Sequence, residues 1–144
     1  MQNRALPTSE GNWIERLRHA PRLEGFGPVS ARFIHSMRLI ALHEQAGRDP
    51  VPELAGRLGS ISVAAKSLEL SQAVCATWPE NIHVSPFCCQ AMTHDEMTIA
   101  LMIEAVIDRD RTAFVASLEG LIRPDRVERL WDCALGLVTM EIAK

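Results

Sequence analysis

Two adjacent cysteines, Cys88 and Cys89, lie between His83 and His94, and these four side chains are the clearest candidates for chemistry in the chain. Cysteine and histidine are ligands of tetrahedral zinc sites, so the four residues could hold zinc or iron. A strong zinc half-site, however, separates its cysteines by two to four residues, and neighbours in an extended backbone point to opposite faces. A metal site here is therefore an alternative rather than the main expectation, and no other cofactor is expected.

The same two cysteines could act as redox-active or nucleophilic thiols. A helix N-terminus favours a thiolate, but Cys89 lies four residues before Thr93, where the next helix is expected to begin. Asp95 and Glu96 also bring negative charge to that first turn, which works against a thiolate. Free cysteine is among the most buried residue types, so we expect the pair, and likewise Cys75 and Cys133 on apolar helix stripes, to lie in the core.

Residues 52–68 are similar to a helix-turn-helix motif, which needs a short helix, a glycine-containing turn and a recognition helix. Five residues could pack the two helices together: Leu54, Ala55, Leu58, Ile61 and Ala65. The exposed face of the second helix would then offer a single lysine, Lys66, against Glu69, which is a poor match for a phosphate backbone. DNA binding through residues 52–68 is a second alternative, and we do not expect nucleic acid as a partner.

Other catalytic patterns are missing from the sequence. It contains no phosphate-binding or dinucleotide-binding glycine motif, no H-E-x-x-H zinc motif and no G-x-S-x-G nucleophile motif. Glu104 with Asp108, and Glu128 with Asp132, each form a carboxylate pair one turn apart, but no glutamate has a histidine three residues later, as di-metal sites require. We expect these carboxylates to face solvent, and we predict no catalytic residue and a protein that is not an enzyme.

Length and composition are typical of one globular domain of 144 residues, with 47% hydrophobic residues, 23% charged residues and a net charge of −3. The most apolar run, residues 97–107, would span only about 16 Å as a helix, which is too short to cross a bilayer. The N-terminus has no secretory signal pattern. We therefore expect a cytoplasmic protein with free thiols and no membrane span.

The hydrophobic pattern predicts an all-α bundle of five to six helices, the longest at about 29–46, 60–78, 94–108 and 124–143. Residues 1–28 are interrupted by proline and glycine and predict an arm with one short amphipathic helix, Asn12–Ala20, whose apolar side chains are Trp13, Ile14 and Leu17. Residues 29–144 form a single helical domain. In helix 60–78 we expect the buried stripe to be Ile61, Ala64 or Ala65, Leu68 and Cys75.

Residues 93–96, Thr-His-Asp-Glu, predict a capping box at the start of helix 94–108. The segment from His83 to Glu96, in which a proline and a cysteine pair precede Met92-Thr93 and this capped helix, resembles a family of small helical proteins from sphingomonad-type alphaproteobacteria. Phe87 stands where that family has a further cysteine, which weakens any site made of three thiolates. The resemblance implies an all-α bacterial cytoplasmic protein and carries no activity.

Helix 94–108 is apolar around most of its circumference, and the C-terminal half of helix 124–143 is apolar on more than one side. A helix of this kind must be covered on several sides, and large exposed apolar surfaces usually mark interfaces. We therefore expect a protein that acts through protein–protein association, most simply as a homodimer with a possible regulatory role, because two-fold dimers are the commonest closed assembly.

Overall fold

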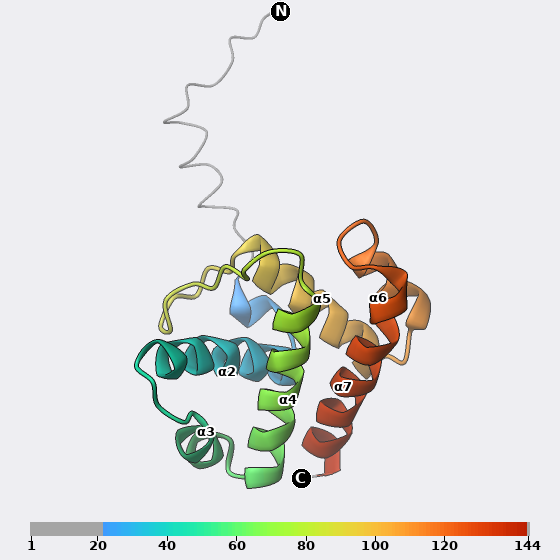
Figure 1. Cartoon of the computed structure of the whole chain (residues 1–144). Coiled ribbons are helices and arrows are strands. Elements are labelled where there is room, and N and C mark those ends of the chain that lie inside the picture. Colours follow the sequence, from blue (N-terminus) through green and yellow to red (C-terminus); the bar gives the residue numbers. More distant parts are fainter. Residues whose placement is uncertain (1–21, 144) are drawn as a thin grey trace, which may run out of the picture.

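The computed structural model describes residues 22–143, and the predicted arm helix at residues 12–20 lies outside them. The elements in chain order are a 3₁₀ turn, η1 (Leu23–Gly25), and the helices α2 (Pro28–Gln45), α3 (Val51–Leu58), α4 (Ile61–Thr77), α5 (His94–Ile107), α6 (Arg111–Leu118) and α7 (Pro124–Ala143) (Figure 1). Within the described range there is no strand, only an isolated antiparallel bridge between Arg22 and Ala91. The predicted all-α bundle is confirmed.

Local sequence signals set the ends of the helices. Gly47 and Gly59, with φ of +68° and +73°, adopt the left-handed conformation that ends α2 and α3. The Ser60 hydroxyl accepts a hydrogen bond from the Val63 N–H at the start of α4. The Thr93 hydroxyl accepts one from the Glu96 N–H, and the Glu96 carboxylate accepts one from the Thr93 N–H, so the predicted capping box is present.

Helices α4 and α7 run side by side in opposite directions, and α5 lies against α2, α6 and α7 (Figure 1). The central part of α5 is buried, including Ile99, Met102, Ile103 and Val106, and only Leu101 among its large apolar side chains is strongly exposed, at 46%. Other helices of the same chain therefore cover the apolar circumference of α5. The sequence was expected to give α5 more apolar surface than one chain could cover. In the structure, α5 needs no second chain to cover it.

Of the face that the sequence of α4 predicts to be buried, only Ala64 lies in the core. Ile61 is 69% exposed, Ala65 and Cys75 are also exposed, and Leu68 is half-buried. The buried face contains Val63, Ala64, Ser67, Leu70, Ser71 and Val74. Because α4 is apolar or small on almost every side, periodicity could not decide between the faces.

Among residues 22–143, no helix combines the length and the apolar character that crossing a membrane would require.

Candidate functional site

Arg38, on α2, is almost completely buried, with 1% of its surface exposed. Its Nε donates a hydrogen bond of 2.8 Å to Oε2 of Glu96, and its Nη2 donates one of 2.9 Å to Oε1 of the same carboxylate. Glu96 lies in the first turn of α5 and is itself fully buried. The pair is a bidentate ion pair in the interior, the strongest geometry available to arginine and a carboxylate.

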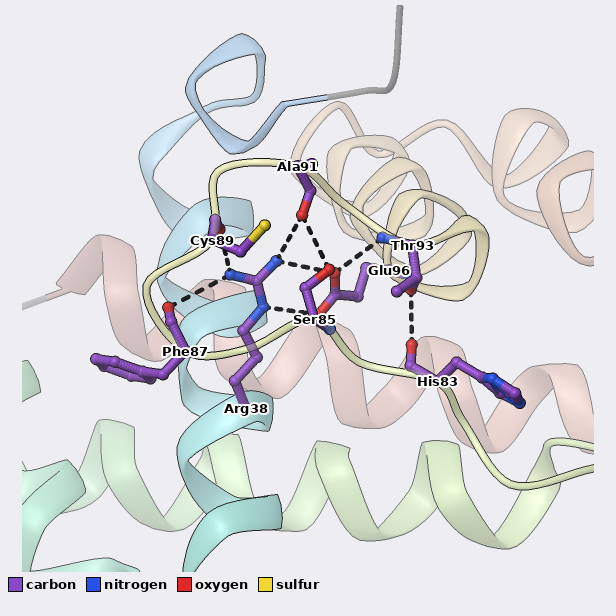
Figure 2. A network of polar contacts seen from close by, with 8 residues as sticks. All are labelled: Arg38, His83, Ser85, Phe87, Cys89, Ala91, Thr93 and Glu96. Atoms are coloured by element: carbon purple, nitrogen blue, oxygen red, sulfur yellow. Dashed lines mark hydrogen bonds and ion pairs between the residues drawn. The ribbon is translucent and has the colours of Figure 1, made fainter. Parts of the chain in front are cut away.

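The remaining donors of Arg38 hold the irregular segment between α4 and α5, residues 78–93, which we call the clamped loop (Figure 2). Nη1 donates to the backbone oxygens of Cys89, at 2.7 Å, and Phe87, at 3.4 Å. Nη2 donates to the backbone oxygen of Ala91, at 3.3 Å. Loop carbonyls that would otherwise lack helical or sheet partners are satisfied in this way by one side chain.

Glu96 holds the same loop from the other side. Its carboxylate accepts hydrogen bonds from the backbone N–H groups of Ser85, at 3.1 Å, and Thr93, at 3.0 Å. Burial alone raises the pKa of Glu96, but the hydrogen bonds from Arg38, Thr93 and Ser85 outweigh burial, and the net pKa lies below its usual value. The carboxylate is therefore ionised at neutral pH, and its oxygens are occupied by the loop and by Arg38.

Further contacts fix the two ends of the clamped loop. Asp95 accepts hydrogen bonds from the His83 N–H, at 2.9 Å, and from Nε1 of Trp78, at 3.4 Å. The Thr93 hydroxyl donates to the His83 carbonyl at 2.6 Å, and the Ser85 hydroxyl donates to that of Ala91 at 2.9 Å. The loop is irregular but held along most of its length.

Phe87 lies over a small cleft between α2 and α3. Its ring is 5.6 Å from that of His35 and 5.0 Å from the guanidinium of Arg57. Burial, followed by the charge of Arg38, lowers the pKa of His35. Two arginines line the cleft. Arg57 pairs with Glu53 at 2.9 Å and Arg32 pairs with Glu141 at 3.1 Å, so neither is free to bind an anion.

The four predicted metal ligands are not brought together. His83, His94 and Cys88 are exposed and Cys89 is half-buried. Residues 22–143 contain no group of three or more histidine, cysteine, aspartate or glutamate side chains placed to hold a metal ion. The predicted core position is wrong for Cys88, which is exposed. The clamped loop turns its carbonyls inward and leaves Cys88 in a turn at the surface. A hydrogen bond of 3.0 Å from the Cys89 N–H to the Pro86 carbonyl closes this turn.

The other two cysteines also lie nearer the surface than predicted. Cys75 is exposed on α4, where partial burial and then the charge of Glu44 raise the pKa of its thiol. Cys133 is half-buried on α7, and burial is the largest cause of the raised pKa of its thiol. The position of Cys75 follows from the face that α4 presents to the core, described above.

Helices α3 and α4 do form a helix–turn–helix pair, joined at Gly59. Leu54 and Leu58 are buried as expected, but Ile61 and Ala65, which were expected to pack the pair together, are exposed. The only lysine of α4, Lys66, pairs with Glu69 at 3.4 Å. The exposed face of α4 is thus apolar and nearly neutral, which does not suit a polyanion.

The predicted solvent-facing position of Glu104 is wrong. Its side chain is half-buried and accepts hydrogen bonds from the Gly27 N–H, at 3.0 Å, and from the Ser30 hydroxyl, at 2.7 Å. It therefore joins α5 to the first turn of α2. Glu128 is exposed and pairs with Arg111 of α6.

Arg38, the residue that organises the site, was not identified from the sequence. A usable signal existed, because Arg38 interrupts an otherwise apolar helix face between Ile34 and Ala41. An arginine on such a face needs a buried acid, and Glu96 of the predicted capping box was available. No family model matches the chain, and neither the curated proteins nor the solved structures contain a significant match to it.

Proposed function

We propose that this protein acts by association rather than by a reaction, and that two copies pair through one face of α4. This face, which we call the α4 strip, consists of Ile61, Ala65, Leu68, Gln72 and Cys75. Its members recur at alternating intervals of four and three residues, the spacing of a coiled-coil seam. Helices α2, α3 and α7 pack against α4 elsewhere, so the strip is the face that a second copy can reach.

Charge favours an antiparallel arrangement of the two copies. In an antiparallel pair centred on Leu68, Ile61 of one copy lies opposite Cys75 of the other. Lys66 and Glu69 lie on the same side of the strip, with Lys66 further round, against Gly136 of α7 and 3.4 Å from Glu69 of its own chain. The two-fold axis brings that side against its own copy. Lys66 and the other copy's Glu69 then differ by one residue in height, about 1.5 Å, close enough for two symmetric ion pairs.

A parallel pair lacks this match. The two-fold axis of a parallel pair runs along the helices, so the charged edge of one copy meets the opposite edge of the other. That edge carries Ala64 and Ser71, which are buried against the body of their own chain. Lys66 would find no acid in the second copy, and the antiparallel pair is therefore the arrangement that we propose.

The chemistry of the clamped loop agrees with a binding role. Both members of the buried ion pair, Arg38 and Glu96, are engaged with each other and with loop backbone groups. They act as positioning residues for the surface that the loop presents. The bacterial cytoplasm is the location that we propose, from the family resemblance and from the absence of disulfides among the four cysteines of residues 22–143.

Light scattering on the eluting protein tests this function. At micromolar concentration we expect a mass of about 32 kDa, twice the 16.0 kDa of one chain. Ala65→Glu places a charge in the seam, at an exposed helical position that accepts glutamate, and should give the mass of a single chain. Ala113→Glu, at an exposed position of α6 away from the strip, is the matched control and should leave the dimer intact. A wild-type mass of 16 kDa across the accessible concentration range would contradict the proposal.

A further inference from the structure

The arm of the clamped loop that leaves α4 bonds to the body of the protein through every second residue. The N–H groups of His83 and Ser85 donate to carboxylates in the first turn of α5, at 2.9 and 3.1 Å. The Thr93 hydroxyl donates to the His83 carbonyl at 2.6 Å (Figure 2). Within the described part of the chain, no hydrogen bond involves the backbone N–H or carbonyl of Ile82 or Val84.

This alternation is that of an extended strand with one side unpaired. Successive residues of a strand direct their backbone polar groups to opposite sides, and their side chains alternate with the same period. Accordingly, the side chains of Asn81 and His83 are exposed, whereas those of Ile82 and Val84 are half-buried. We call the N–H and carbonyl groups of Ile82 and Val84 the free edge. It presents donors and acceptors two residues apart, the pattern with which an added strand pairs.

A cavity of about 230 Å³ borders the free edge, between the clamped loop and α2. Its lining includes Leu42 on α2 and Val84, Pro86 and Phe87 of the loop. Leu42 is 49% exposed although it is a large apolar residue. The one charged residue of the lining, Arg38, is engaged with loop carbonyls and a buried carboxylate. The cavity therefore suits an apolar side chain rather than an ion.

We infer that the free edge binds an extended peptide of a partner protein, as an added β-strand with an apolar side chain in the adjacent cavity. In this mode of recognition, main-chain hydrogen bonds supply affinity and pockets for alternate side chains supply specificity. Both features occur together here. Because Arg38 and Glu96 fix the loop before binding, little conformational entropy is lost when the peptide adds.

A second copy of this chain is a poorer match for the same edge. Two free edges paired antiparallel about a two-fold axis would place His83 of each copy opposite His83 of the other. The apolar side chains of this arm, Ile82 and Val84, pack against their own core, so neither can fill the cavity of the other copy. The inference does not depend on the α4 strip, because the cavity shares none of the strip's residues.

Peptide selection followed by NMR tests this inference. The probe is a phage-displayed library of short random peptides, screened against the wild-type full-length chain. We expect binders with apolar side chains at alternate positions. In the free protein, the amides of Ile82 and Val84 should exchange quickly and those of His83 and Ser85 slowly. A selected peptide should slow the exchange at Ile82 and Val84 at least about tenfold.

Substitutions test the edge and the cavity separately. Val84→Pro removes one N–H of the free edge without removing a hydrogen bond of the fold, and should weaken peptide binding at least about tenfold. Val84→Thr keeps that N–H and the branched shape, and is the matched control. Leu42→Asp should also weaken binding, whereas Leu101→Asp, at a position that is 46% exposed and outside the cavity, should not. Circular dichroism shows which variants fold, and Leu42→Asp carries the test if Val84→Pro does not fold.

The inference is wrong if the library yields no binder, or if a selected peptide leaves exchange at Ile82 and Val84 unchanged. Equal binding by folded Val84→Pro and wild type would also overturn it. Protection of the free edge that rises with protein concentration, without peptide, would assign the edge to a second copy instead. Ala65→Glu separates this site from the α4 strip, because that variant should bind the peptide as the wild type does.

Discussion

The guanidinium of Arg38 and the carboxylate of Glu96 meet in the interior through two hydrogen bonds of 2.8 and 2.9 Å, although the residues are 58 positions apart in the chain. These two side chains join α2, α5 and the clamped loop to one another. Arg38 makes three further hydrogen bonds to loop carbonyls, and Glu96 receives two from loop N–H groups. The pair thus gives an irregular segment a defined shape.

Removal of one partner of this pair should destabilise the fold strongly. Arg38→Met keeps an unbranched side chain but leaves the charge of Glu96 buried and uncompensated, and we expect the free energy of unfolding to fall by about 3–5 kcal/mol. Adding Glu96→Gln should restore part of that loss, because the unpaired charge is then gone. Urea unfolding followed by circular dichroism measures all three proteins.

Arg123→Met is the control for this experiment, because Arg123 forms an exposed ion pair with Asp125, away from the clamped loop, and should change stability little. If Arg38→Met were no more destabilised than Arg123→Met, the buried pair would not be what holds the loop.

Stability should also depend on pH through Glu96. The pKa of Glu96 in the folded protein lies below the value of 4.5 that applies when the side chain is free. The stabilisation from its ionised form is therefore complete above pH 4.5 and is lost as the pH falls through the lowered folded-state pKa. The difference in free energy of unfolding between wild type and Glu96→Gln should be constant near neutral pH and shrink in acid. A difference that stayed constant down to about pH 3 would show that folding does not lower the pKa of Glu96.

The four thiols should react with an alkylating reagent in a defined order. Cys88 is exposed at the turn of the clamped loop and should react first. Cys75 is also exposed, but burial and Glu44 raise the pKa of its thiol, which lowers the reactive thiolate fraction. If α4 pairs with a second copy, the rate at Cys75 should fall further as protein concentration rises, while the rate at Cys88 should not. Peptide mass spectrometry gives both rates, and a rate at Cys75 that ignored concentration would count against the α4 strip.

Reversal of charge beside the α4 strip should change the dissociation constant of the dimer and leave the fold of each chain intact. Lys66→Glu places acids opposite acids in the antiparallel pair and should raise the dissociation constant of the dimer by about tenfold. The double variant Lys66→Glu/Glu69→Lys should restore it, because the two partners are exchanged. Sedimentation equilibrium measures the constants. Failure of the double variant to recover would show that these two residues do not face each other across the interface.

The helices were predictable because their signals are local. Proline, glycine and Ser60 mark the ends of α3 and α4, and the capping box at Thr93 starts α5. The hydrophobic pattern also predicts α2 and α7 to within a few residues. In these segments, propensity, capping and periodicity agree, and tertiary packing leaves the assignment unchanged.

The face that α4 buries and the contacts of Arg38 with loop carbonyls were not predictable in the same way. Helix α4 is apolar or small on nearly all sides, so the side that meets α7 depends on the shape of α7 and not on the sequence of α4. The partners of Arg38 come from a segment about 50 residues away. Several of them are backbone carbonyls, which every residue has, so the residue types in that segment do not indicate the contact. For the same reason, the sequence assigned Cys75 and Cys88 to the core.

Disulfide trapping tests the antiparallel α4 pair most directly. With Cys88, Cys89 and Cys133 replaced by serine, Ile61→Cys places a thiol opposite the native Cys75 of the second copy. Mild oxidation should then give a covalent dimer in which peptide mapping joins position 61 to Cys75. The same background without Ile61→Cys should stay uncrosslinked, because the two copies of Cys75 lie at opposite ends of the interface. A dimer joined through Cys75 alone, or no dimer in either protein at concentrations where light scattering detects association, would contradict the antiparallel pairing of α4.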